Sequence, residues 1–166
     1  MEPEVSGEPL SDREIVVSRV IEGSQSLVFA AFSNAAHLSH WWGPNGFTIT
    51  THSFEFGPGG VWDFTMHGPD GTDFPNWIEW LEISPPERIM LRHGANADDP
   101  DAFTSMVTIV GRGDISEVTL RSVFNTKAQR DEVVDKYQAI ESAEQTLGRL
   151  AGYVAAPVEP LSKGGG

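Results

Sequence analysis

The stretch TKAQRDEVVDKYQAIESAEQTLGRLAGYV, residues 126–154, decides the fold. Thr126 and Gln129 have the spacing of a capping box, in which two side chains satisfy backbone N–H groups at the start of a helix. An apolar stripe with helical spacing follows, made of Val133, Tyr137, Ile140, Ala143, Leu147, Leu150 and Val154. The pattern predicts one long amphipathic helix over 126–154, whose apolar side must cover another element.

The middle of the chain supplies that element. From Phe47 to Phe124 the hydrophobic period changes to two, which is typical of strands with one buried face. The expected strands cover 47–56, 60–67, 74–84, 88–93, 103–111 and 116–124, separated by GPGG, GPDG, PPE, GANADDPD and GRGD. These short connections suit hairpins, so the run predicts an antiparallel meander.

Three elements precede the meander. The β-branched run at 13–21 predicts a strand, and the segment 24–34 has helical spacing. Asn34 is a good N-cap for a second short helix that ends at Gly43-Pro44 and carries Trp41 and Trp42 on its apolar face. The order predicts an α+β helix-grip fold, with a curved antiparallel sheet of about seven strands around the C-terminal helix. Such curvature normally leaves a cavity between helix and sheet.

Composition limits the classes of partner. A chain of 166 residues with 39% hydrophobic content predicts a single domain over 13–154, with flexible tails at 1–12 and 155–166. Eleven basic and twenty-four acidic residues give a net charge of −13, so we expect neither nucleic acid nor a membrane as partner. The absence of cysteine excludes thiol nucleophiles and thiolate metal sites. The acidic N-terminus lacks a signal-peptide pattern, so we expect a cytoplasmic protein.

Three segments carry a family resemblance. HLSHWWGPNGFT at 37–48, FEFGPGGVWDFTMHGPDG at 54–71 and EISPPERI at 82–89 resemble the START-like (SRPBCC) superfamily. Within it, the chain is similar to the stand-alone homologues of the activator of heat-shock protein 90 ATPase, from about Arg13 to Val154. The resemblance implies the helix-grip fold. That family commonly has Glu-Gly-Trp on its last helix, whereas this chain has Glu141, Ser142 and Ala143. We therefore expect the cavity to extend toward Ala143, where a methyl group replaces an indole.

The strand pattern also predicts what lines the cavity. In the strand 60–67, Trp62, Phe64 and Met66 alternate with polar residues, so their side should face the helix. An apolar, aromatic lining favours a hydrophobic or aromatic small molecule, lipid-like or polyketide-like, with no cofactor. A solid core without a ligand would produce the same alternation. The expected lining is Trp41, Trp42, Trp62, Phe64, Met66, Trp80, Leu91, His93, Val107, Leu120, Tyr137, Ile140, Ala143 and Leu147.

The tryptophan pair has two interpretations. Two large rings can anchor a helix that is too short to be stable alone, or one ring can close a ligand gate. Mutating Trp41 and Trp42 separately would distinguish scaffold from gate.

Candidate catalytic residues come from two strands. In the strand 74–84 either phase brings a carboxylate inward, Glu79 in one and Glu82 in the other. A carboxylate in an apolar cavity has a raised pKa and could act as acid or base. His93 shares the parity of Ile89 and Leu91 and could reach the cavity. The alternatives are glutamates paired with arginine at the surface and a structural histidine.

A metal site on the short second helix has little support. His37 and His40 are three residues apart on the short helix, but no third ligand lies near them, so we expect no metal site and exposed imidazoles.

Three functions remain open. The first is a binding protein for a hydrophobic small molecule, without assigned catalysis. The second is an enzyme, since some START-like relatives resemble cyclases, aromatases or hydrolases that act on aromatic or polyketide substrates. The third, implied by the family name, is a co-chaperone that stimulates the heat-shock chaperone ATPase. We rank it last, because the eukaryotic activators resemble two-domain proteins and this chain has no room for the further N-terminal domain.

Overall fold

A computed structural model describes residues 10–155. The expected tails over 1–12 and 155–166 lie outside the described residues, apart from Ala155 and a short 3-10 helix, η1, at Leu10–Asp12. The order is β1 (Glu14–Ile21), α1 (Gln25–Ala30), α2 (Ala35–Trp41), β2 (Thr48–Phe54), β3 (Val61–His67), β4 (Asp73–Ser84), β5 (Arg88–Gly94), β6 (Phe103–Arg112), β7 (Ile115–Val123), α3 (Lys127–Tyr137) and α4 (Ala139–Ala155).

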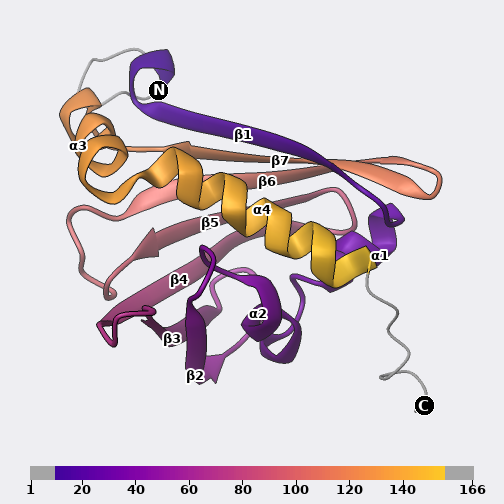
Figure 1. Ribbon diagram of the computed structural model, residues 1–166, viewed down its shortest axis with the longest axis horizontal. Helices are drawn as coiled ribbons and strands as arrows, with labels where there is room; N and C mark the ends of the chain where they lie inside the picture. Colours follow the sequence, from indigo (N-terminus) through magenta and orange to yellow (C-terminus); the bar gives the residue numbers. More distant parts are fainter. Residues whose placement is uncertain (1–9, 156–166) are drawn as a thin grey trace.

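The strands form one curved antiparallel sheet in the order β1-β7-β6-β5-β4-β3-β2. The meander from β2 to β7 is confirmed, and β1 adds to it by pairing antiparallel with β7. Helix α4 crosses one face of this sheet diagonally, while α1 and α2 gather near its C-terminal end (Figure 1). The helix-grip arrangement predicted from the order of elements is therefore correct.

The core lies between α4 and the inner face of the sheet. Leu147, Leu150 and Val154 are buried on α4, and alternate residues of the strands face them, as the two periodicities require. In the part of the chain that the structure describes, no helix is long and apolar enough to span a bilayer.

The long C-terminal helix is interrupted, which corrects the prediction of a continuous helix over 126–154. Gln138 has a left-handed backbone, with φ 53°, and it separates α3 from α4. Thr126 caps α3 as predicted, its side chain accepting a hydrogen bond from the Gln129 N–H. The turn changes the direction of the helix axis, so the stripe no longer follows one face. Tyr137 is consequently 65% exposed and Ile140 is 38% exposed.

The two tryptophans that end α2 lie on different sides of its packing. Trp41 is 1% exposed, meets Phe32 edge-on and donates its indole N–H to the Ala31 carbonyl at 3.1 Å. Trp42 is 9% exposed and contacts the rings of Trp62 and His93. Trp41 thus anchors α2 to α1, whereas Trp42 faces the sheet.

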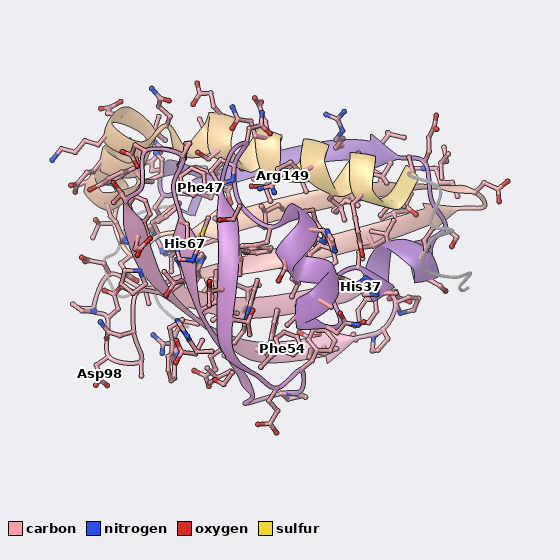
Figure 2. All side chains as sticks on the ribbon, turned by 60° about the horizontal axis from the view of Figure 1, so that its bottom comes forward. His37, Phe47, Phe54, His67, Asp98 and Arg149 are labelled. Atoms are coloured by element: carbon pink, nitrogen blue, oxygen red, sulfur yellow. The ribbon has the colours of Figure 1, made fainter. Side chains whose placement is uncertain are left out.

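The end of α2 is held from α4 by a single guanidinium group. Arg149 donates to the carbonyls of Trp42, Gly43 and Pro44 at 3.3, 3.0 and 2.9 Å. Figure 2 shows Arg149 between α4 and the loop that carries Phe47. Gly43 has φ 101°, a conformation that glycine adopts without strain, so the chain turns here and exposes its carbonyls to the arginine. Desolvation lowers the pKa of Arg149, although its chemistry keeps it charged.

Helix α2 has a second link to α4 through Tyr153. The Tyr153 hydroxyl lies 2.6 Å from His37 Nδ1, and the ring of His40 stacks on Tyr153 at 5.2 Å. His40 is exposed as expected, but His37 is partly buried, because the two histidines cover one tyrosine from the neighbouring helix.

Candidate ligand-binding pocket

A pocket of about 430 Å³ lies between the sheet and the junction of α3 and α4. Its floor comes from the inner face of the strands, its roof from the two helices, and one side from the segment that follows α2. The lining is Ile15, Trp42, Gly43, Pro44, Phe47, Met66, Phe74, Asn76, His93, Phe103, Ser105, Leu120, Ser122, Phe124, Val133, Tyr137, Ala139, Ser142, Ala143 and Thr146.

The pocket exists because the side chains of α4 that face the sheet are small at one end of the helix and large at the other. Helix α4 presents only small residues there, namely Ala139, Ser142, Ala143 and Thr146, so the helix backbone does not fill the curve of the sheet. Further along, Leu147 and Leu150 close the same gap with branched side chains and leave a solid core. The change from small to large residues along one helix face therefore sets the depth of the pocket.

Polar side chains on the floor of the pocket are few and form two pairs, while Tyr137, Ser142 and Thr146 contribute hydroxyl groups from the helices. His93 Nε2 lies 2.6 Å from Asn76 Oδ1, and the hydroxyls of Ser105 and Ser122 lie 2.9 Å apart. No lysine, arginine, aspartate or glutamate lines this pocket within residues 10–155. The interior is therefore close to neutral, in contrast to the acidic surface.

His93 is the titratable group at the centre of the lining. Burial lowers its pKa from 6.5 to about 4, and the nearby Asp99 carboxylate opposes this shift only in part. The ring contacts the aromatic rings of Trp42, Phe64 and Phe103, which exclude water from most of its surface. His93 is thus a neutral imidazole at physiological pH, a poor general base and a good hydrogen-bonding group.

The pocket brings together six of the residues expected at the site, namely Trp42, Met66, His93, Leu120, Tyr137 and Ala143. Another group lies in the buried core instead: Trp41, Trp62, Phe64, Trp80, Leu91, Val107 and Leu147. These seven pack within the buried hydrophobic cluster, where neighbouring side chains fill the space. Ile140 lies outside the lining because the turn at Gln138 rotates it away.

Neither candidate carboxylate faces the pocket, which corrects the expectation that one must point inward. A β-bulge between Trp80 and Glu82 places Leu81 outside the pairing and changes the parity of β4. Ile78, Trp80 and then Ile83 therefore face inward. Glu79 pairs with Arg92 at 3.5 Å and Glu82 with Arg88 at 3.2 Å, on the outer face and the strand end.

Several lining residues are absent from the expected set of fourteen. Alternation places Phe103, Ser105 and Ser122 on strand faces that describe the pocket, and the structure has all three in the lining. Asn76 was ambiguous because the bulge obscured the phase of its strand. Phe47 and the Gly43-Pro44 segment lie in a loop, where no periodicity exists to indicate which side chains turn inward.

A second hollow, of about 470 Å³, lies on the opposite side of α4. Charged and amide side chains line it, among them Arg19, Glu141, Glu144 and Gln145. Among residues 10–155, no three histidine or acidic side chains are arranged to hold a metal ion.

A curved antiparallel sheet wrapped around a C-terminal helix, with a pocket between them, defines the START-like helix-grip class of protein. The chain belongs to a family within that class, described as Activator of Hsp90 ATPase homolog 1-like protein, which matches residues 23–155.

Solved structures share this fold at low sequence identity. A protein from Arthrobacter aurescens is 20% identical with a TM-score of 0.81, covering 91% of each chain. A protein from Nitrosomonas europaea is 19% identical with a TM-score of 0.76, over 87% of this chain and 95% of that one. The AHSA1 protein from Silicibacter pomeroyi is 20% identical with a TM-score of 0.69, over 86% and 97%. No curated protein matches the chain significantly.

Proposed function

We propose that the protein binds a hydrophobic or aromatic small molecule in the pocket beneath α3 and α4, without catalysing a reaction on it. The observation that carries the proposal is the size and character of the pocket. A volume of about 430 Å³ falls within the range of small-molecule sites, and most of its lining is hydrocarbon or aromatic.

Two further features support binding over a packed core. Tyr137 and Phe74 stand at the rim, 65% and 42% exposed, although both also line the pocket. Large exposed rings around an apolar hollow are typical of a binding site, because a ligand removes them from water. The outward pairing of Glu79 and Glu82 also leaves the pocket without a carboxylate, which disfavours the cyclase-like or hydrolase-like alternative.

The co-chaperone role stays outside this proposal. The solved structures are similar to this chain at about 20% sequence identity, so they support its fold and not a shared partner. No feature of residues 10–155 distinguishes a surface for the chaperone.

The experiment is a fluorescence titration with N-phenyl-1-naphthylamine, a neutral probe that becomes bright in apolar surroundings. We expect saturable binding to the wild-type protein and a loss of at least tenfold in affinity for Ala143→Phe, whose added ring occupies the pocket. Ala128→Phe is the matched control, because Ala128 lies on the exposed surface of α3 and outside the lining. Absence of saturable binding to the wild type, or equal binding to Ala143→Phe, would overturn the proposal.

A further inference from the structure

The polar groups on the floor of the pocket lie on adjacent strands, and they restrict which chemical groups of a ligand can bind there. Asn76 and His93 belong to β4 and β5, while Ser105 and Ser122 face each other across β6 and β7. Ser105 also pairs with Leu91, two residues before His93. The two polar pairs are therefore neighbours on the floor of the pocket, and hydrocarbon surrounds them.

The position of the proton on the His93 ring follows from the orientation of the Asn76 amide group. The Asn76 Nδ2 group donates to the Phe74 carbonyl at 3.0 Å, so Oδ1 is the atom that faces His93. Because that oxygen can only accept, His93 Nε2 carries the proton of the neutral ring. Nδ1 then has a free lone pair, and it has no hydrogen-bond partner within the described part of the chain. His93 is thus poised as an acceptor.

The serine pair has the complementary capacity. One hydroxyl donates to the other across 2.9 Å, which leaves the hydrogen of the second hydroxyl without an acceptor among residues 10–155. The floor of the pocket therefore offers one unused acceptor and one unused donor. A single hydroxyl group, which both donates and accepts, matches this pair of functions.

Anionic ligands do not fit the same floor. A carboxylate or phosphate would lose its hydration in the pocket without gaining a positive partner. Arg149 is the nearest arginine on the roof helix, but it lies outside the lining and donates to the carbonyls that follow α2. The Asp99 carboxylate, in the loop after β5, is close enough to interact electrostatically with His93, and its negative charge would repel an anionic ligand. Fatty acids and acyl phosphates are therefore disfavoured.

From these contacts we infer that the pocket takes a neutral aromatic or polycyclic alcohol or phenol, whose hydroxyl donates to His93 Nδ1. The inference rests on the proposed binding function and specifies the ligand class for the same site. A ligand fills about half of the available space at the packing density of an organic liquid and about three quarters at that of a protein interior. The pocket volume of about 430 Å³ therefore accommodates a molecule of roughly 220–320 Å³.

The test compares naphthalene, 2-naphthol and 2-naphthoate at neutral pH, three probes that share one ring system. Affinity is measured by the quenching of tryptophan fluorescence, since Trp42 forms part of the wall. We expect the wild type to bind 2-naphthol about five- to tenfold more tightly than naphthalene, the worth of one neutral hydrogen bond, and to bind 2-naphthoate most weakly.

His93→Phe keeps a flat ring and removes the acceptor, so the ratio of the affinities for 2-naphthol and naphthalene should fall to about one, and this ratio is read out independently of any change that both affinities share. Equal affinity of the wild type for naphthol and naphthalene, or tightest binding of naphthoate, overturns the ligand class but leaves the proposed binding function standing. Persistence of the naphthol preference in His93→Phe also overturns it. Failure of all three probes and of N-phenyl-1-naphthylamine overturns both proposals. The wild-type comparison needs no variant, so it decides the question even where His93→Phe does not fold.

Discussion

Separate substitutions of the adjacent tryptophans at the end of α2 should affect different properties. Trp41→Phe removes two ring carbons and the indole nitrogen from a site that is 1% exposed. The lost burial costs about 1.5 kcal/mol. The Ala31 carbonyl loses its partner at 3.1 Å, which adds roughly 1–3 kcal/mol. We expect the free energy of unfolding to fall by about 2.5–4.5 kcal/mol, with little change in ligand affinity.

Trp42→Phe should behave in the opposite way. Its indole N–H has no hydrogen-bond partner within residues 10–155, and its ring borders a space that already exists. Only the burial term applies, so the loss of stability should stay near 1.5 kcal/mol. The pocket becomes wider, and the affinity for N-phenyl-1-naphthylamine should change severalfold.

Urea denaturation followed by circular dichroism measures the stability of both variants without relying on the tryptophans themselves. Fluorescence titration with N-phenyl-1-naphthylamine measures affinity in the same preparations. Equal losses of stability in the two variants would refute the assignment of Trp41 as the anchor. A change in affinity confined to Trp41→Phe would refute the assignment of Trp42 to the pocket wall.

Three further outcomes are expected. Arg149→Met should lower the free energy of unfolding by about 2–4 kcal/mol in urea denaturation, because the carbonyls after α2 lose a charged donor. Arg88→Met, which removes an exposed ion pair, should cost under about 1 kcal/mol and serves as its control. Gln138→Gly should raise the midpoint of thermal unfolding, with a gain of about 1 kcal/mol, because glycine adopts φ 53° without strain; an unchanged or lower midpoint would contradict this. The native pKa of His93 lies below that of the unfolded chain, so stability should decrease as pH falls from 6.5 to about 4, by up to about 3 kcal/mol. Denaturation at several pH values should show that decrease, and His93→Phe should reduce it.

The strands and the helix starts were determined by the sequence itself. A period of two, broken by Gly- and Pro-containing turns, specifies each hairpin locally, since both the alternation and the turn act within about ten residues. Asn34 and Thr126 cap their helices through side chains that reach backbone groups three residues away. Such signals can be read without knowing where the rest of the chain lies.

The tertiary structure decided where those elements change direction. Gln138 carries no glycine or proline signal, yet its left-handed backbone ends α3 and removes Ile140 from the buried face. The bulge at Leu81 likewise depends on how β4 pairs with β5, and it places Glu82 on the same outward side as Glu79. Cross-strand pairing and packing outweigh local preference at these positions, because burial against a distant partner contributes more than the small propensity differences between residues.

The pocket shows the same division. Strand alternation indicated that His93 would face the interior and helical spacing indicated the same for Ala143, but the pairs that define the floor depend on the register between neighbouring strands. Ser105 meets Ser122, and Asn76 meets His93, each across seventeen positions. Whether a space remains above them depends on the volumes of side chains contributed by both the sheet and α4. A sequence records each of those volumes separately, and only the packed fold determines whether together they fill the gap.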